Sequence, residues 1–148
     1  MKATLLFVLR DGEVLLIRKK RGLGAGKMNG PGGRVEPGET AEQCAVREVE
    51  EELGIRVLDP RWRGELHFQF VDGLALHCVV FTGTQFEGTP VETDEAVPHW
   101  TKFDAVPFAE MWADDIHWLP GLLKGGNFRA WFDFDADAML TQRVEWLS

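Results

Sequence analysis

Residues 33–55 read GRVEPGETAEQCAVREVEEELGI and contain the clearest structural signal in the chain. Apolar side chains recur there every three or four positions, which is the spacing of one helix face. The segment opens at Glu39 and Thr40, where Thr40 is suited to cap a helix, and Gly54 is placed to end it. We therefore predict a helix that runs to Leu53. The apolar residues on its predicted buried face are Ala41, Cys44, Ala45, Val49 and Leu53.

Three glutamates of this predicted helix share one face. Glu48, Glu51 and Glu52 stand at positions i, i+3 and i+4, so their Cβ atoms lie about 5–6 Å apart. Like charges at this spacing weaken a helix, and a bound cation compensates for them. Carboxylate oxygens favour hard cations, Mg²⁺ first and Mn²⁺ as an alternative. A solvated acidic face is the competing interpretation, but the neighbouring glycine-rich loop and Arg47 favour a metal site.

Around this helix the sequence predicts strands and turns. The pairs Asp11-Gly12 and Asp72-Gly73 are hairpin signals between apolar runs. Residues 18–33, RKKRGLGAGKMNGPGG, are too rich in glycine for regular structure and leave backbone N–H groups free to face a ligand. We predict one α/β domain over residues 1–148, with a mixed β-sheet between α-helices. The expected strands are 3–9, 14–17, 62–71, 74–82, 99–103 and 128–134, and the expected short helices are 106–112 and 116–124.

The composition describes an acidic globular protein. The 148 residues include 16 Lys+Arg and 24 Asp+Glu, a formal net charge of −8, which argues against binding to nucleic-acid polymers or anionic membranes. No run is long and apolar enough for a membrane span. However, residues 18–35 hold six basic and no acidic residues beside the acidic helix, a pairing that suits phosphates bridged by metal.

The spacing of cysteines and histidines indicates no further metal site. Cys44 and Cys78 lack a CxxC or Cys/His arrangement, so we expect two buried free thiols in a reducing compartment, the cytoplasm, and no zinc. The histidines share no ligand spacing and are expected to be ordinary strand or surface residues. We also expect the chain to be a monomer. The four histidines are His67, His77, His99 and His117.

The segment 33–55 resembles the Nudix box, G-x5-E-x7-R-E-U-x-E-E-x-G-U, in which U is a bulky aliphatic residue, at every specified position. The resemblance implies the Nudix fold, a mixed sheet sandwiched between helices, and hydrolysis of a nucleoside diphosphate linked to another group. It also implies that Glu48, Glu51 and Glu52 hold a divalent metal, to which the carbonyl of Gly32 or Gly33 adds a ligand. The residues that would support the motif structurally are Gly33, Glu39, Arg47 and Gly54.

Four further segments resemble one branch of that family, the oxidised purine nucleoside triphosphatases of the 8-oxo-dGTP pyrophosphatase type. The segments are 19–33, 88–95, 106–115 and 128–134. The resemblance implies that Asn29, Asp114 and Asp115 read the purine edge and that Trp112 stacks on the base. It further implies that Lys19 faces the pocket and that Glu95 joins the metal site. The residues that would line the pocket are Thr4, Phe68, Phe70 and Leu76, beside Gly32 and Gly33.

Carboxyl chemistry supports these base-reading roles. An aspartate accepts hydrogen bonds when ionised and donates one when protonated, so Asp114 and Asp115 together suit guanine-like and adenine-like edges. The alternatives are a helix N-cap for the aspartates, a turn residue for Asn29 and a core residue for Trp112. Animal members of the branch carry aromatic residues where this chain has others, and each lost stacking pair removes about 0.5–1.5 kcal/mol. These positions are Leu23, Met28 and Pro31.

The predicted activity is Mg²⁺-dependent hydrolysis of oxidised purine nucleoside triphosphates, such as 8-oxo-dGTP or 2-hydroxy-dATP, to the monophosphate and pyrophosphate. Glu52 is the expected chief metal ligand, and Glu48 or Glu95 is the expected general base. A small-molecule triphosphate is the expected partner. Three alternatives stay open. They are a Nudix enzyme for CTP, ADP-ribose or dinucleoside polyphosphates, a nucleotide-sensing module without catalysis, and a purely structural protein, which would not need an uncompensated glutamate triad.

Overall fold

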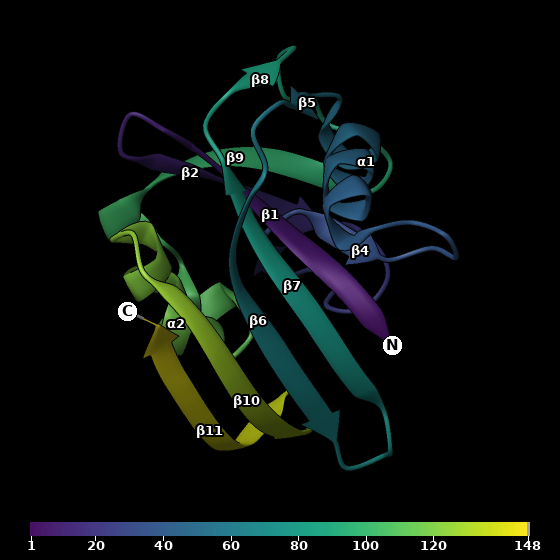
Figure 1. Ribbon diagram of the computed structural model, residues 1–148, viewed down its shortest axis with the longest axis vertical. Coiled ribbons are helices and arrows are strands. Elements are labelled where there is room, and N and C mark those ends of the chain that lie inside the picture. Colours follow the sequence, from purple (N-terminus) through teal and green to yellow (C-terminus); the bar gives the residue numbers. More distant parts are fainter. Residues whose placement is uncertain (148) are drawn as a thin grey trace.

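The computed structural model describes residues 1–147, in which a large mixed sheet carries a helix on each face (Figure 1). The strands are β1 (Lys2–Arg10), β2 (Glu13–Lys19), β3 (Met28–Asn29), β4 (Gly32–Arg34), β5 (Arg56–Val57), β6 (Arg61–Phe70), β7 (Ala75–Gly83), β8 (Phe86–Glu87), β9 (Ala96–Lys102), β10 (Asn127–Asp135) and β11 (Ala138–Leu147). The helices are α1 (Ala41–Leu53) and α2 (Asp115–Leu123), with short 3-10 turns at Phe103–Ala105 and Phe108–Glu110.

The main sheet has nine strands in the order β11-β10-β6-β7-β1-β2-β3, with β4 paired to β1 and β9 paired to β2. The pairs β1–β7 and β6–β10 are parallel, and the remaining pairs are antiparallel. β5 and β8 form a separate two-stranded sheet. A mixed sheet between helices is the predicted fold class, and the structure confirms it.

Both faces of the central strands are buried. In β1, Leu6 and Val8 belong to the apolar cluster under α1, whereas Phe7 belongs to the cluster that contains Trp118 of α2. Successive side chains of a strand point to opposite faces of the sheet. A strand that is covered on both faces therefore needs apolar residues at consecutive positions, which explains the run TLLFVL. The sheet is therefore the middle layer of three (Figure 1).

The ends of α1 follow the predicted signals. The Thr40 hydroxyl accepts a hydrogen bond from the Gln43 backbone N–H, and the Gln43 side chain accepts one from the Thr40 N–H, which completes a capping box. Gly54 ends the helix in the left-handed region with φ of 75°, and its N–H donates to the Glu50 carbonyl. The turn at Asp11 and Gly12 also has positive φ at both residues, as the predicted hairpin requires.

Three sequence predictions about secondary structure were wrong. The glycine-rich segment 18–33, expected to be irregular, ends in β3 and β4, because glycine lets the backbone at 32–34 pair closely with β1. Residues 106–112, expected to be helical, contain only the turn 108–110, because Pro107 interrupts the segment. β11 was missed, since most of its side chains are exposed and it carries little of the apolar alternation that marks a half-buried strand.

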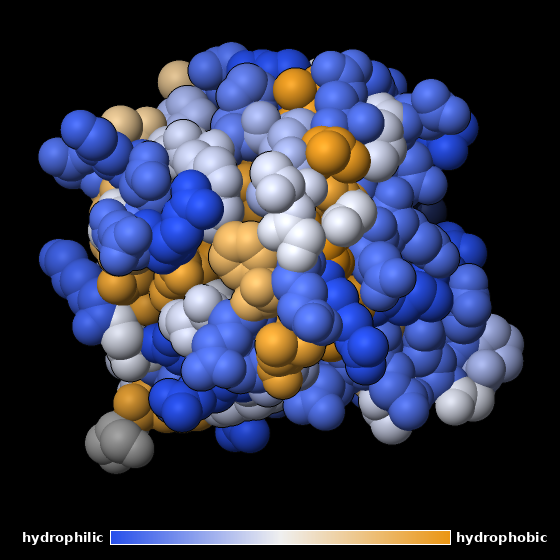
Figure 2. Space-filling view, turned by 90° about the horizontal axis from the view of Figure 1, so that it is seen from above, coloured by the Kyte–Doolittle hydropathy of each residue, from blue (hydrophilic) through white to orange (hydrophobic). Residues whose placement is uncertain are grey.

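The two thiols agree with the sequence-based expectation. Cys44 and Cys78 are both free and buried. Neither helix within residues 1–147 is long and apolar enough to cross a membrane. Seen from the end that carries β5 and β8, hydrophilic side chains predominate, with apolar areas scattered between them (Figure 2).

Candidate active site

A cavity of about 320 Å³ opens beside the sheet and brings together all of the residues predicted to bind substrate. Its walls come from β1, β6 and β7, from the glycine-rich segment, and from the chain that leads into α2. The predicted residues that line it are Thr4, Lys19, Asn29, Gly32, Gly33, Phe68, Phe70, Leu76, Trp112, Asp114 and Asp115. Of the four predicted catalytic glutamates, only Glu52 reaches the lining.

Two glycines allow the backbone to form one side of the cavity. A Cβ atom at Gly32 would lie 1.9 Å from the Thr4 carbonyl oxygen, and one at Gly30 would lie 2.5 Å from the Phe7 ring. Any side chain at these positions would therefore push the segment away from β1. The glycines thus place the loop against the sheet and keep its backbone at the cavity surface.

Two adjacent carboxyl groups lie at the cavity wall, almost out of contact with water. Asp114 is 1% exposed and Asp115 is 8% exposed. Burial raises the pKa of Asp114, although Trp118 Nε1 donates to its Oδ2 atom over 2.8 Å. Burial and the charge of Asp114 raise the pKa of Asp115 well above 3.8. Neither carboxylate caps α2, because Asp114 makes no side-chain capping bond. The pair can present a protonated donor beside an acceptor.

Trp112 stands at the cavity with its ring held by neighbours. Its ring meets Phe134 edge to face at 5.9 Å, and Lys27 Nζ lies 5.2 Å from the ring centroid. A Cβ atom at Gly24 would lie 2.8 Å from Trp112 Nε1, so that glycine, with φ of +81°, is needed for close approach. Asn29 is oriented locally, since its Nδ2 donates to the Lys27 carbonyl over 3.1 Å.

Apolar side chains complete the pocket, and sequence reasoning missed some of them. Phe68 and Phe70 project from β6 and stack against Phe132 and Phe134 of β10. Leu66 lies two residues before Phe68 on β6, so the alternation of side chains along a strand could have predicted that it faces the cavity. The positions of the other missed residues depend on strand register, which the sequence did not show. The missed apolar lining residues include Phe7, Leu66, Cys78 and Phe134.

Glu52 connects the Nudix-box helix to the cavity. Its side chain is 3% exposed, and its Oε1 accepts a hydrogen bond from the Gly32 N–H over 3.0 Å. Burial raises the pKa of Glu52 to about 8, because removing a carboxylate from water disfavours its charge. An adjacent cation would offset this cost, so the site suits a hard metal ion.

Gly33 makes room for the second box glutamate. A Cβ atom at Gly33 would lie 2.4 Å from Glu48 Cδ, so the carboxylate occupies the space that any other residue would fill. Burial raises the pKa of Glu48, even though Arg47 Nη1 donates to its Oε1 over 2.9 Å. The first glycine of the box and Glu48, the first of its predicted metal ligands, are thus in direct contact.

Arg47 joins the helix to the loop before it. Its Nε and Nη2 atoms donate to the two carboxylate oxygens of Glu39 over 2.6 and 2.9 Å, and Nη2 also donates to the Arg34 carbonyl over 3.2 Å. The guanidinium bonds lower the pKa of Glu39 to about 2. This bidentate pair supports the orienting role expected for both residues.

The remaining predicted metal ligands lie at the surface. Glu51 is half-exposed and lies 3.3 Å from Arg47 Nη1. Glu95 precedes β9 and lies 3.4 Å from Arg21 Nη2, while the charges of both Glu51 and Glu95 contribute to raising the pKa of Glu48. The charges of these carboxylates therefore act on one another, but no three of them place one oxygen each within 4.8 Å of the other two in residues 1–147. All of their donor atoms are hard oxygens, the type that Mg²⁺ or Mn²⁺ prefers.

The three positions that lack an aromatic residue have different surroundings. Leu23 lines the cavity and is half-exposed. Met28 is buried in the apolar cluster under α2, and Pro31 is buried with its carbonyl accepting from the Leu6 N–H. Only Leu23 among them therefore stands where a ring would face a ligand in the cavity.

Comparisons with known proteins point to one family. The family model described as NUDIX domain matches residues 1–122. The chain is 44% identical over 140 residues to the "Oxidized purine nucleoside triphosphate hydrolase" of Danio rerio, covering 94% of this chain and 90% of the relative. The protein of the same name from Mus musculus is also 44% identical over 140 residues, covering 93% and 90%.

The structural comparison agrees. The crystal structure of the mMutator MutT protein from Bacillus halodurans superimposes with a TM-score of 0.85 at 28% sequence identity and covers 97% of both chains. Nudix hydrolases generally use a divalent metal such as Mg²⁺, and the glutamates of α1 have the chemistry for one. Residues 33–55 carry the complete box around α1 and the family model covers residues 1–122, so the chain belongs to the Nudix family.

Proposed function

We propose that this chain hydrolyses oxidised purine nucleoside triphosphates to the nucleoside monophosphate and pyrophosphate, with Mg²⁺ as cofactor and Mn²⁺ as a substitute. The observation that carries the proposal is the buried pair Asp114 and Asp115 in the cavity that Glu52 also lines. The relatives named as oxidised purine nucleoside triphosphate hydrolases, at 44% identity, support the same substrate class.

The base binds in the apolar part of the cavity. Trp112 and Phe68 offer aromatic surface for stacking, and Asn29 offers an amide at the same lining. A protonated Asp115 beside Asp114 donates one hydrogen bond and accepts others, so the pair matches the altered donor and acceptor pattern of an oxidised purine.

The triphosphate extends toward α1. Lys19 lies in the cavity lining, and Lys20, Arg21 and Arg34 belong to the same basic segment, so the chain attracts a polyanion at this end. Bound Mg²⁺ supplies neutralisation of phosphate charge and a lower pKa for an attacking water. The residues that would hold it are Glu48, Glu51, Glu52 and Glu95, with the Gly32 carbonyl.

The protein residues have separate tasks in this reaction. Arg47 positions Glu48 through the 2.9 Å hydrogen bond, and Gly33 leaves the space for that carboxylate. Glu48 or Glu95 accepts the proton of the attacking water. Gly32 fixes the Glu52 carboxylate through its N–H.

The proposal also concerns cellular context. Two buried free thiols, Cys44 and Cys78, support a reducing compartment, which we take to be the cytoplasm. We also propose that the protein is a monomer. Size-exclusion chromatography with light scattering tests this assignment, and a dimer mass would contradict it.

A substrate panel tests the activity. We expect the highest kcat/KM, measured by pyrophosphate release with Mg²⁺, for 8-oxo-dGTP, 2-hydroxy-dATP or O6-methyl-dGTP, and a lower value for dGTP and CTP. Selectivity is a ratio of kcat/KM values, so all substrates are compared under one condition. A preference for CTP would replace the substrate class. So would a preference for ADP-ribose, which is measured as release of AMP because its hydrolysis gives no pyrophosphate. Binding without pyrophosphate release would indicate a sensing module.

A single substitution tests base recognition. Asp115→Ala leaves a purine donor or acceptor unpaired in the cavity, which costs about 1–3 kcal/mol. We therefore expect KM for the preferred oxidised substrate to rise about 5- to 150-fold, with kcat changed less. Asp104→Ala, at an exposed position outside the cavity, is the control. An unchanged KM in Asp115→Ala would contradict the base-reading role.

A further inference from the structure

The sheet has a second polar cluster on the face opposite the cavity. Along β6, Leu66 and Phe68 line the cavity, so Glu65 and His67 project from the other face. α1 packs on that face against β1 and β7 and against the short strands around them, away from β6 and β10. Glu65, His67 and His77 are consequently only partly buried.

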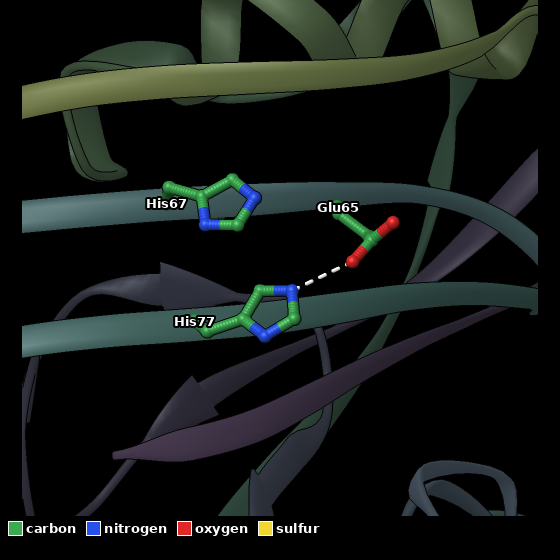
Figure 3. A group of neighbouring side chains, drawn as sticks. All are labelled: Glu65, His67 and His77. Carbon is green, nitrogen blue, oxygen red and sulfur yellow. Dashed lines mark hydrogen bonds and ion pairs between the residues drawn. The ribbon is translucent and has the colours of Figure 1, made fainter.

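Strand register brings two histidines together. His67 of β6 and His77 of β7 are direct cross-strand partners, and their rings stack with centroids 4.5 Å apart and an interplanar angle of 5°. Glu65 Oε1 lies 2.7 Å from His77 Nε2 (Figure 3). One ligand atom from each of the three side chains lies within 4.8 Å of the other two, and no other such trio occurs in residues 1–147.

Neighbouring side chains hold the trio in place. Arg129 Nε donates to Glu65 Oε2 over 3.3 Å, which fixes the carboxylate and leaves Oε1 toward His77. Trp131 of β10 stacks on His67 with centroids 5.7 Å apart and an interplanar angle of 10°.

We propose that Glu65, His67 and His77 form a binding site for a divalent transition-metal cation of the zinc class, separate from the glutamates of α1. Two imidazole nitrogens with one carboxylate oxygen suit Zn²⁺, Co²⁺, Ni²⁺ or Cu²⁺ better than Mg²⁺. Zinc sites with two histidines and one glutamate leave a further position for water. A surface groove of about 520 Å³, lined by His67, His77 and Trp131, provides that space.

The proposed site links the two strands that form one wall of the cavity. β6 and β7 contribute Phe68 and Leu76 to the cavity on one face and the three ligands on the other. A metal ion that bridges them stabilises the folded state, because binding to the folded form alone shifts the unfolding equilibrium. We therefore expect Zn²⁺ to raise the Tm of the protein.

Calorimetric titration with ZnCl₂ in excess MgCl₂ tests the site. We expect one Zn²⁺ per chain in the unsubstituted protein and in His99→Gln, a control at an exposed position on β9. His67→Gln and His77→Gln each remove one ligand and should weaken binding by at least about tenfold. Histidine NMR spectra provide a second readout, in which zinc shifts the ring signals of His67 and His77 and leaves those of His99 in place.

Two further variants keep the test decisive. Glu65→Gln retains a hydrogen-bond acceptor for His77 and serves if a histidine variant fails to fold, as judged by its metal-free melting curve. Glu52→Gln alters the proposed Mg²⁺ site and should bind zinc like the unsubstituted protein, so the result is independent of the hydrolase activity. Equal zinc affinity in His77→Gln, Glu65→Gln and His99→Gln would overturn the proposal, and so would the absence of binding to the unsubstituted protein.

Discussion

At the scale of single residues, burial sets the chemistry of the two cavity aspartates. Asp114 keeps partial support for its charge from Trp118, whereas Asp115 is buried beside another carboxylate. Two adjacent buried carboxyls do not both ionise readily, so the second retains its proton to higher pH. This difference gives the pair one acceptor and one donor, which is the property the proposed base recognition needs.

The buried pair predicts a pH-dependent stability. The pKa of Asp115 in the folded chain lies above the value of 3.8 in the unfolded chain, so stability falls as pH rises above that value. Asp115→Asn mimics the protonated form. We expect its Tm to match that of the unsubstituted protein near pH 4 and to exceed it at pH 7. The difference should be about 2–4 °C for each kcal/mol of unfavourable charge burial that the substitution removes.

Thermal melts across this pH range check the expectation, with Asp104→Asn as the exposed control. A Tm for Asp115→Asn that is lower than that of the unsubstituted protein at both pH values would contradict it. Such a result would mean that Asp115 is ionised in the folded chain.

Glu52 predicts a separation between binding and turnover. Glu52→Gln keeps an oxygen that accepts from the Gly32 N–H but removes the charge proposed to hold Mg²⁺. We expect kcat to fall roughly 10²–10³-fold, the range for removing one charge-stabilising group, with little change in affinity for the base. Glu50→Gln, on the exposed face of the same helix, is the matched control. Steady-state kinetics with retained turnover would remove Glu52 from the mechanism.

At the scale of elements, α1 and the loop before it act as one unit because Arg47 binds both. The guanidinium holds Glu39 with two bonds and Glu48 with one, so a single side chain sets the position of a loop residue and of a proposed ligand. Lysine lacks the planar fork that makes this bidentate contact. The requirement explains why arginine stands at this position.

This unit predicts a second pH dependence of opposite sign. The pKa of Glu39 is lowered to about 2 from 4.5, so its contribution to stability is present above pH 4.5 and is lost as pH falls toward 2. We expect Glu39→Gln to lower Tm at pH 7, with the difference shrinking under acid conditions. Circular dichroism melts measure this, and Glu87→Gln on β8 is the control. A difference that is constant with pH would contradict the ion-pair explanation.

At the scale of the whole molecule, a buried arginine connects α2 to the sheet. Arg63 of β6 donates to the carbonyls of Leu122 and Gly126 over 3.2 and 2.8 Å and to Asn127 Oδ1 over 2.8 Å. Burial lowers the pKa of Arg63. The arginine thus holds the end of the helix that begins at the cavity aspartates.

Arg63→Met should therefore affect both stability and substrate binding. The substitution removes the Arg63 donors to the Gly126 carbonyl and to Asn127 Oδ1, whereas the Leu122 carbonyl keeps the Gly125 N–H. A buried acceptor left unpaired costs about 1–3 kcal/mol, so we expect a clear decrease in Tm. We also expect a higher KM for the oxidised substrate, because α2 begins at Asp115. Arg61→Met, an exposed position on the same strand, is the control for melts and kinetics. Identical behaviour of the two variants would show that Arg63 does not position α2.

Local signals predicted much of the fold. The capping box at Thr40, the stop at Gly54 and the hairpin turn at Asp11 depend on residues close in sequence, and all were predicted. β11 was missed because an exposed strand carries little apolar alternation. The prediction of a helix over residues 106–112 was wrong, because helical spacing alone did not account for Pro107.

Two features of the protein could be identified from the sequence alone. The chain carries a complete Nudix box with three glutamates at helical spacing, and a basic glycine-rich segment lies directly before it. These signals are readable because helix periodicity, capping and charge act over a few residues.

Long-range packing decided the rest. The meeting of His67 with His77 follows from strand pairing. The burial of Asp114 and Asp115 and the placement of Leu23 at the cavity follow from how the start of α2 and the glycine-rich segment pack against the sheet. A side chain's exposure and its neighbours across a sheet are set by register between distant segments, and spacing along the chain carries no information about that register.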